Sequence, residues 1–185
     1  MAEYTFAQNP FPLGSTAPHF QLKGVDSSHH GLEDYEAKPF LVVSFVCNHC
    51  PYVQAYWGRL IALQDEFFDR GVQFLGINSN DSSRYPEDSF EKMVETHHIL
   101  NLNFPYLHDE SQQVAHAYHA ERTPQIFVFN AERKLVYTGG IDDSYSDSGK
   151  VMERPLYEAL KALVEDRQVP KPQAHFIGCS IKWKE

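Results

Sequence analysis

The sequence predicts an α/β fold, with a central mixed β-sheet flanked by helices, an N-terminal hairpin and a C-terminal extension. Three segments support this prediction. Residues 40–46 are a nearly continuous apolar run rich in β-branched side chains, as expected of a strand covered on both faces, and residues 72–77 are predicted to be a second buried strand. Between them, residues 51–68 open with Pro51 and place apolar side chains largely at helical spacing. Strands and helices that alternate in this way fold as a sheet covered by helical layers.

The N-terminal part is predicted to be an irregular arm followed by the hairpin. Residues 1–16 contain two prolines and a glycine and show no regular pattern. Residues 19–22 alternate in a way that suits a short strand, and residues 27–31 read as a polar turn.

The rest of the chain continues the alternation of strands and helices. Pro105 marks an edge-type strand, because proline cannot donate a hydrogen bond to a sheet ladder. Residues 130–133 are predicted to join two strands as a hairpin. The predicted elements are a helix at 87–98, the edge strand at 104–107, a short helix at 111–119, strands at 126–129 and 135–138, and a closing helix at 152–165.

Length and charge narrow the classes of function. The 185 residues fit one domain at 17–168, preceded by the arm and followed by a tail at 169–185 that we expect on the surface. A net charge of −9 without clustered Lys and Arg argues against a general nucleic-acid binder. The sequence has no apolar stretch of membrane-spanning length and no leader-like start, so we expect a cytoplasmic protein.

The cysteines point to redox chemistry. The chain has three, an odd number that cannot form a closed set of internal disulfides, and Cys47 and Cys50 lie three residues apart. A thiolate is the nucleophile in disulfide exchange, and the start of a helix stabilises negative charge. We therefore predict Cys47 as the exposed nucleophile, Cys50 as the covered second thiol, and His49 as a group that stabilises the thiolate when protonated.

Metal binding is the alternative for the same residues. A four-ligand zinc site usually needs a second ligand pair at similar spacing, and the chain does not offer one. The pairs at 29–30 and 97–98 do not place two histidine rings on one helix face. Asp142, Asp143 and Asp147 lack the spacing of a calcium loop and read as a polar surface loop. We therefore expect no metal and no cofactor.

Several segments resemble a known family. The run from Cys47 through Asn48, His49 and Cys50 to Pro51 follows a buried strand, and Thr123-Pro124 precedes another. This pattern resembles the thioredoxin-like superfamily, and its AhpC/TSA-type branch of peroxiredoxin-like proteins in particular. Residues 17–22 and 178–183 are similar to the same branch, so the resemblance covers roughly residues 15 to 183.

The resemblance implies a thioredoxin-like fold and a thiol-disulfide oxidoreductase that exchanges electrons with protein or small-molecule disulfides. It also implies a cis peptide bond before Pro124, with the backbone of Thr123 pairing with the extended chain of a substrate. One departure concerns proton handling. Leu41 stands where thioredoxins have a buried aspartate, so we expect water or His49 to handle the proton instead.

A hydroperoxide-reducing activity is the second hypothesis. In peroxiredoxins a proline, a hydroxyl and a later arginine activate the peroxidatic cysteine. Here Ser44 fills the hydroxyl position, Phe40 replaces the proline, and Arg122 is a partial match for the arginine. Cys50 or Cys179 would resolve the sulfenic acid. If Cys179 does so, the tail has to bring it to the dithiol.

A third hypothesis belongs to another class, a copper- or zinc-binding domain or a redox-inert adaptor of the same fold. Copper handling would need a further histidine or methionine near the pair, and none of the three methionines is near it in the sequence. For Cys179, the alternative to a tail that brings it to the dithiol is a passive surface thiol. The physiological partner and the direction of electron flow do not follow from the residues.

Overall fold

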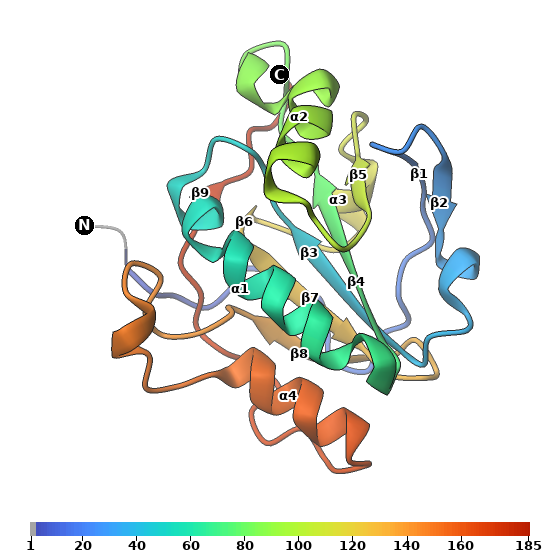
Figure 1. The fold of residues 1–185 in the computed structure, drawn as a ribbon, viewed down its shortest axis with the longest axis vertical. Helices are drawn as coiled ribbons and strands as arrows, with labels where there is room; N and C mark the ends of the chain where they lie inside the picture. The colour runs from blue at the N-terminus through green and yellow to red at the C-terminus, as the bar shows by residue number, and fades with distance from the viewer. Residues whose placement is uncertain (1–2) are drawn as a thin grey trace.

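The computed structural model describes residues 3–185 and contains a seven-stranded mixed sheet in the order β2-β1-β5-β4-β3-β7-β8 (Figure 1). A second, two-stranded sheet pairs β6 with β9. The strands are β1 (Gln21–Gly24), β2 (His29–Gly31), β3 (Phe40–Phe45), β4 (Val72–Asn78), β5 (Tyr106–His108), β6 (Arg122–Thr123), β7 (Gln125–Phe129), β8 (Leu135–Gly139) and β9 (Cys179–Ser180). The α-helices are α1 (Pro51–Phe67), α2 (Phe90–Leu100), α3 (Gln113–Ala117) and α4 (Pro155–Val164).

The predicted central strands form the core of the sheet. β3 runs parallel to β4 on one side and antiparallel to β7 on the other. Phe45, Phe74 and Phe127 come from these three strands and are fully buried, as predicted. Burial of each such side chain contributes about 1.5–3 kcal/mol, so these strands form a rigid platform. The thioredoxin-like layering of helices on a mixed sheet is therefore confirmed.

Two hydrophobic layers cover the two faces of this sheet. Side chains of α1 and α4 pack on one face, including Leu60 and Leu156. Val114 of α3 and Phe11 of the N-terminal arm pack on the other face. Figure 1 shows α1 and α4 running side by side in front of the sheet.

Helix α1 begins directly after the dithiol. Pro51 is its first residue and Cys50 its N-cap, and its buried face includes Val53 and Trp57. A 3-10 turn over Phe68–Arg70 follows, and Gly71 with φ of 90° ends it, a backbone angle that favours glycine. The order of strand, cysteine pair and helix is confirmed.

The predicted edge strand is wrong. β5 lies inside the sheet, between β1 and β4. Pro105 stands just before this strand and accepts a hydrogen bond from the backbone N–H of Gly76 at 2.9 Å. Pro105 takes part in the sheet only as an acceptor, so its missing N–H leaves no gap in the hydrogen bonds of β5. The strand can therefore pair on both sides.

Other boundaries move because of local capping. α2 begins at Phe90, three residues later than predicted, since a 3-10 turn over Pro86–Asp88 precedes it and Ser89 accepts a hydrogen bond from the Lys92 N–H. α4 likewise begins late, with Pro155 as its first residue. The hairpin is confirmed, but part of its predicted turn is strand β2.

The tail is buried in part, whereas the prediction placed it on the surface. Phe176, Ile177 and Ile181 are at most 4% exposed, because they pack into the two hydrophobic layers. β9 of the tail pairs antiparallel with β6, and Figure 1 shows this red segment beside the start of α1. In the described part of the chain, none of the helices combines the length and apolarity needed to cross a membrane.

Candidate active site

Three thiols from distant parts of the chain converge at the start of α1. Cys47 follows β3, Cys50 caps α1, and Cys179 lies in β9. The Sγ of Cys50 lies 3.0 Å from the Sγ of Cys179 and 3.2 Å from the carbonyl oxygen of Thr123. The Sγ of Cys47 lies 3.4 Å from the hydroxyl of the same Thr123. All three are free thiols, so this is a cluster in its reduced form.

Thr123 and Pro124 frame this cluster, and the peptide bond between them is cis. Thr123 is 2% exposed. The amide oxygen of Gln125 accepts hydrogen bonds from the backbone N–H groups of Glu121 and Arg122, at 2.8 and 3.2 Å. This side chain therefore holds the loop that carries Thr123 against the thiols.

The two cysteines of the motif differ from the prediction in exposure and in the direction of their pKa shifts. Both are fully buried, so Cys47 is not exposed. Hydrogen bonding from Cys47, and further hydrogen bonds from Cys179 and the backbone of Val53, lower the pKa of Cys50 to about 5. Hydrogen bonding with Cys50 and burial raise the pKa of Cys47. The neutral Cys50 thiol donates to the Thr123 carbonyl, and its lowered pKa makes Cys50, at the helix N-terminus, the first thiol of the cluster to ionise.

A carboxylate near the motif was missed by the sequence analysis. Asp88 is fully buried and its Oδ2 lies 2.5 Å from Nδ1 of His49. Its Oδ1 accepts hydrogen bonds from the backbone N–H groups of Asn48 and His49, at 2.7 and 3.3 Å. Ligand atoms of Cys47, His49 and Asp88 all lie within 4.8 Å of one another. Thiol, imidazole and carboxylate thus form a compact group suited to proton transfer.

Asn48 fixes the loop rather than contacting the thiols directly. Its side-chain amide donates to the Glu87 carbonyl at 2.9 Å and its side-chain oxygen accepts from the Tyr106 hydroxyl at 2.9 Å. Tyr85 stacks on the His49 ring, with the ring centroids 5.5 Å apart. The predicted supporting residues are therefore held by groups that follow β4 and by Tyr106 of β5.

The same group of Cys47, His49 and Asp88 is the candidate metal site among the described residues. Its hydrogen bonds fit another role better. Both carboxylate oxygens of Asp88 already accept from protein donors, including the Asn80 side chain at 2.7 Å. A metal ion would have to replace these bonds, so the arrangement favours a hydrogen-bonded group over coordination.

The residues expected for a peroxidase do not gather around Cys47, and only Arg122 lies near another thiol, Cys179. The buried Ser44 hydroxyl has no hydrogen-bond partner among the described residues. The Arg122 guanidinium donates to the Gly178 carbonyl at 3.1 Å, which engages it with the tail. Phe40 begins β3, at the opposite end of the strand from Cys47. Hydroperoxide reduction therefore stays a prediction without geometric support from these three positions.

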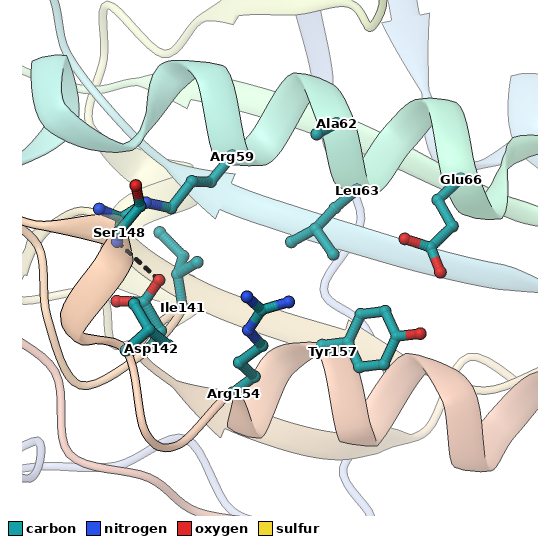
Figure 2. Close-up of a pocket in the computed structure, with 10 residues that line it drawn as sticks. Arg59, Ala62, Leu63, Glu66, Ile141, Asp142, Ser148, Arg154 and Tyr157 are labelled. Atoms are coloured by element: carbon teal, nitrogen blue, oxygen red, sulfur yellow. Dashed lines mark hydrogen bonds and ion pairs between the residues drawn. The ribbon is translucent and has the colours of Figure 1, made fainter.

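A pocket of about 180 Å³ lies between α1, α4 and the loop that follows β8 (Figure 2). Asp142 was predicted to lie in a polar surface loop, but it is 6% exposed and pairs with Arg59 at 2.6 Å. Its other oxygen accepts from the Tyr56 hydroxyl at 2.9 Å. Figure 2 shows Arg59 reaching from α1 to this carboxylate. The pocket is lined by none of the predicted site residues, so we place the chemistry at the thiols.

Comparisons with known proteins bear on the family of the chain. The model of the AhpC/TSA family matches residues 13–138. The thiol-disulfide oxidoreductase ResA of Geobacillus kaustophilus is 30% identical over 131 residues, which cover 69% of this chain and 70% of that protein.

Solved structures give the same result at the level of the fold. The crystal structure of an uncharacterized conserved protein from Geobacillus kaustophilus matches with a TM-score of 0.90 and 45% identity, covering 95% of this chain and 94% of that one. The thioredoxin domain of a thiol-disulfide oxidoreductase from Bacteroides vulgatus matches with a TM-score of 0.60 and 18% identity, covering 69% and 88%. At that identity the second match shows the fold alone. The chain therefore belongs to the AhpC/TSA family, as an oxidoreductase of thioredoxin-like fold.

Proposed function

We propose that the chain is a thiol-disulfide oxidoreductase in which Cys47 and Cys50 cycle between dithiol and disulfide, with protein or small-molecule disulfides as partners. The observation that carries this proposal is the position of Cys50. It caps α1, its pKa is lowered to about 5, and Cys47 is hydrogen-bonded to it. A low-pKa thiolate with a second thiol beside it is the arrangement that disulfide exchange requires.

The reaction follows in two exchanges. The Cys50 thiolate attacks one sulfur of the partner disulfide, the partner's S–S bond breaks, and the other partner sulfur leaves as a thiolate. The Cys47 thiolate then attacks the Cys50 sulfur of this mixed disulfide and releases the second partner sulfur. Two electrons pass from the dithiol to the partner, and the protein ends with a Cys47–Cys50 disulfide.

The second exchange requires Cys47 to lose its proton. In the mixed disulfide Cys50 no longer raises the pKa of Cys47, but burial and the charge of Asp88 still do, so the step is easier with a base. His49 lies near the Cys47 sulfur, and Asp88 accepts the proton on Nδ1 of the His49 ring. This tautomer leaves Nε2 of His49 free to take up a proton, and the Asp88 carboxylate stabilises the imidazolium that results.

A redox titration against glutathione tests the proposal. The protein is equilibrated at a series of ratios of reduced to oxidised glutathione, alkylated, and mapped by mass spectrometry for all three cysteines. We expect a reversible two-electron transition in which Cys47 and Cys50 are protected together. Cysteines that never pair would contradict the proposal and favour the metal-binding or adaptor hypotheses.

Single substitutions assign the two roles. Cys50→Ser should abolish exchange with an external disulfide, because it removes the low-pKa thiolate. Cys47→Ser in a Cys179→Ser background should instead accumulate a mixed disulfide at Cys50, because no second thiol remains to resolve it. The reciprocal variant is Cys50→Ser in a Cys179→Ser background. If it accumulated a mixed disulfide at Cys47 as fast as the first variant does at Cys50, the assignment of the two roles would be wrong.

A further inference from the structure

The tail occupies the backbone edge at which the fold family pairs with an extended partner chain. In β6 and β9, Thr123 pairs with Cys179 and Arg122 pairs with Ser180. The N–H of Ile181 also donates to the carbonyl of Glu121 at 3.0 Å. An extended segment with a cysteine opposite Thr123 is thus built into the chain, and it delivers the Cys179 sulfur to the Cys50 sulfur.

The tail is held on both sides of Cys179. On one side, Gly178 passes so close to Thr123 that an added Cβ would lie 2.5 Å from the Thr123 carbonyl oxygen. On the other, the Lys182 carbonyl accepts hydrogen bonds from the backbone N–H of Asp81 and from the Gln112 side chain, both at 2.8 Å. These contacts fix the position of the thiol.

The tail is also connected to the group around Asp88. The side-chain oxygen of Asn80 accepts from the backbone N–H of Lys182 at 2.9 Å. The amide nitrogen of the same Asn80 donates to Asp88 at 2.7 Å. One buried side chain therefore positions both the tail and the carboxylate beside the dithiol, which makes the three thiols a single preorganised unit.

We propose that Cys179 is a third redox thiol, to which the disulfide first formed between Cys47 and Cys50 is passed. The Cys179 thiolate attacks the Cys50 sulfur, a Cys50–Cys179 bond forms, the Cys47–Cys50 bond breaks, and Cys47 leaves as a thiolate. Cys47 takes up the proton that Cys179 gives up, so no electrons are gained or lost. This inference rests on the proposed dithiol function and adds to it a second oxidised form.

The charges around Cys179 favour this order of events. Burial, and then hydrogen bonding and charge interaction with Cys50, raise the pKa of Cys179 to about 12, whereas Lys182 and Arg122 lower it. Once Cys50 is part of a disulfide it carries no charge. The contribution of the Cys50 thiolate then disappears while the two cations remain, so Cys179 ionises more readily after the first disulfide has formed.

The transfer has a consequence for access. While Cys50 is bonded to Cys179, the tail is covalently fixed against Thr123, and Cys47 is left as a free thiol near His49. An external partner that pairs with Thr123 has to displace the tail. The oxidised protein would thus be closed to extended peptides, whereas the reduced protein would be closed only by the non-covalent contacts of the tail.

The experiment maps disulfides in three proteins oxidised with glutathione disulfide. Wild type is quenched with acid at early times, alkylated and digested. We expect Cys47–Cys50 to appear first and Cys50–Cys179, with Cys47 alkylated, to increase later. Cys47→Ser should lose two hydrogens in mass and form Cys50–Cys179 as its dominant oxidised species. A Cys50 glutathione adduct or an intermolecular dimer in its place would overturn the inference.

Cys179→Ser separates the inference from the function on which it rests. It should still form Cys47–Cys50. If it does, and Cys47→Ser does not bridge Cys50 to Cys179, only the transfer of the disulfide to Cys179 is wrong. If Cys179→Ser forms no disulfide at all, the proposed Cys47–Cys50 dithiol is itself contradicted. Gly178→Ala added to Cys47→Ser should slow one step, the attack of Cys179 on a preformed Cys50–glutathione adduct, by roughly tenfold or more, because misplacement of reacting atoms by about 1 Å has at least this effect. An unchanged rate would overturn the role of the docked tail.

Discussion

The carboxylate of Asp88 lies 2.5 Å from Nδ1 of His49, although 39 residues separate them in the sequence. The same carboxylate accepts from the backbone N–H groups of Asn48 and His49. It therefore fixes both the ring and the loop between the two cysteines of the motif. The position of the thiols depends on a residue that lies outside the motif.

Asp88→Asn tests this dependence. In the variant, an amide nitrogen can take the place of the carboxylate oxygen that accepts from His49 and Asn80. Two donors would then face each other, and a buried donor would lose its acceptor. We expect the free energy of unfolding to fall by about 1–3 kcal/mol and resolution of the mixed disulfide to slow by about 100-fold, the lower end of the general-base range. Urea unfolding and stopped-flow exchange measure the two effects separately.

Asp69→Asn is the matched control, because Asp69 is exposed and lies in the 3-10 turn after α1. It should change stability by no more than about 0.5 kcal/mol. If Asp88→Asn unfolds the protein, His49→Gln tests the kinetic half alone. Mixed-disulfide resolution at the wild-type rate in His49→Gln would exclude the imidazole as the base.

The elements that the sequence predicted well are those with strong local signals. Residues 40–46 are apolar except for Ser44 and became β3 at the centre of the sheet, and Pro51 marked the first residue of α1. Pro105 led to the wrong prediction of an edge strand. Proline has no backbone N–H to donate to a sheet, but Pro105 stands one position before β5 and so does not limit the pairing of that strand. The tail was misplaced since its few apolar residues carry no periodicity, and their burial depends on distant partners.

The candidate site could be predicted only in part for the same reason. The two cysteines and Thr123-Pro124 were recognisable as motifs, whereas Asp88 contributes through tertiary contacts. A signal existed, since β3 and β4 are parallel and polar residues that follow both strands meet at one edge of the sheet. The pKa shifts of Cys47 and Cys50 have the opposite directions to those predicted, because they depend on hydrogen bonds among the three thiols that the sequence does not show.

The thiolate of Cys50 should titrate with a midpoint near pH 5, against an ordinary value near 9. Below the midpoint the thiol is protonated and unreactive, and above it the thiolate is present. Cys47→Ala removes the largest cause of the lowered pKa, the hydrogen bond from Cys47, so its midpoint should rise toward the ordinary value. Ultraviolet absorbance of the thiolate measures both, with Cys50→Ser as the blank.

The same shift predicts a pH dependence of stability. Because the folded pKa of Cys50 lies below the unfolded one, the unfolded chain binds more protons between about pH 5 and 9. The contribution of this thiolate is full above the unfolded pKa and is lost as the pH falls through about 5. The stability difference between wild type and Cys50→Ser should therefore increase from pH 5 to 8 in reducing buffer. A constant difference would contradict the lowered pKa.

Gly58→Ala should stabilise the protein. Gly58 lies on the exposed face of α1, and an added Cβ there meets nothing within 4 Å. Glycine inside a helix costs about 0.8–1 kcal/mol relative to alanine. We expect a gain of about that size in the free energy of unfolding, measured by urea titration, with the thiolate midpoint unchanged. A loss of stability would mean that this face of α1 is not free.

Gly178→Ala should do the opposite at the tail and expose the thiols. The added Cβ would lie 2.5 Å from a backbone oxygen of Thr123. Backbone atoms would have to move to remove this clash. Cys50 is fully buried under this segment, so alkylation of the reduced protein requires the tail to open. Each 1.4 kcal/mol lost from tail docking should accelerate alkylation of Cys50 about tenfold. Gly58→Ala is the matched control, and equal alkylation rates in the two variants would show that the tail does not control access to Cys50.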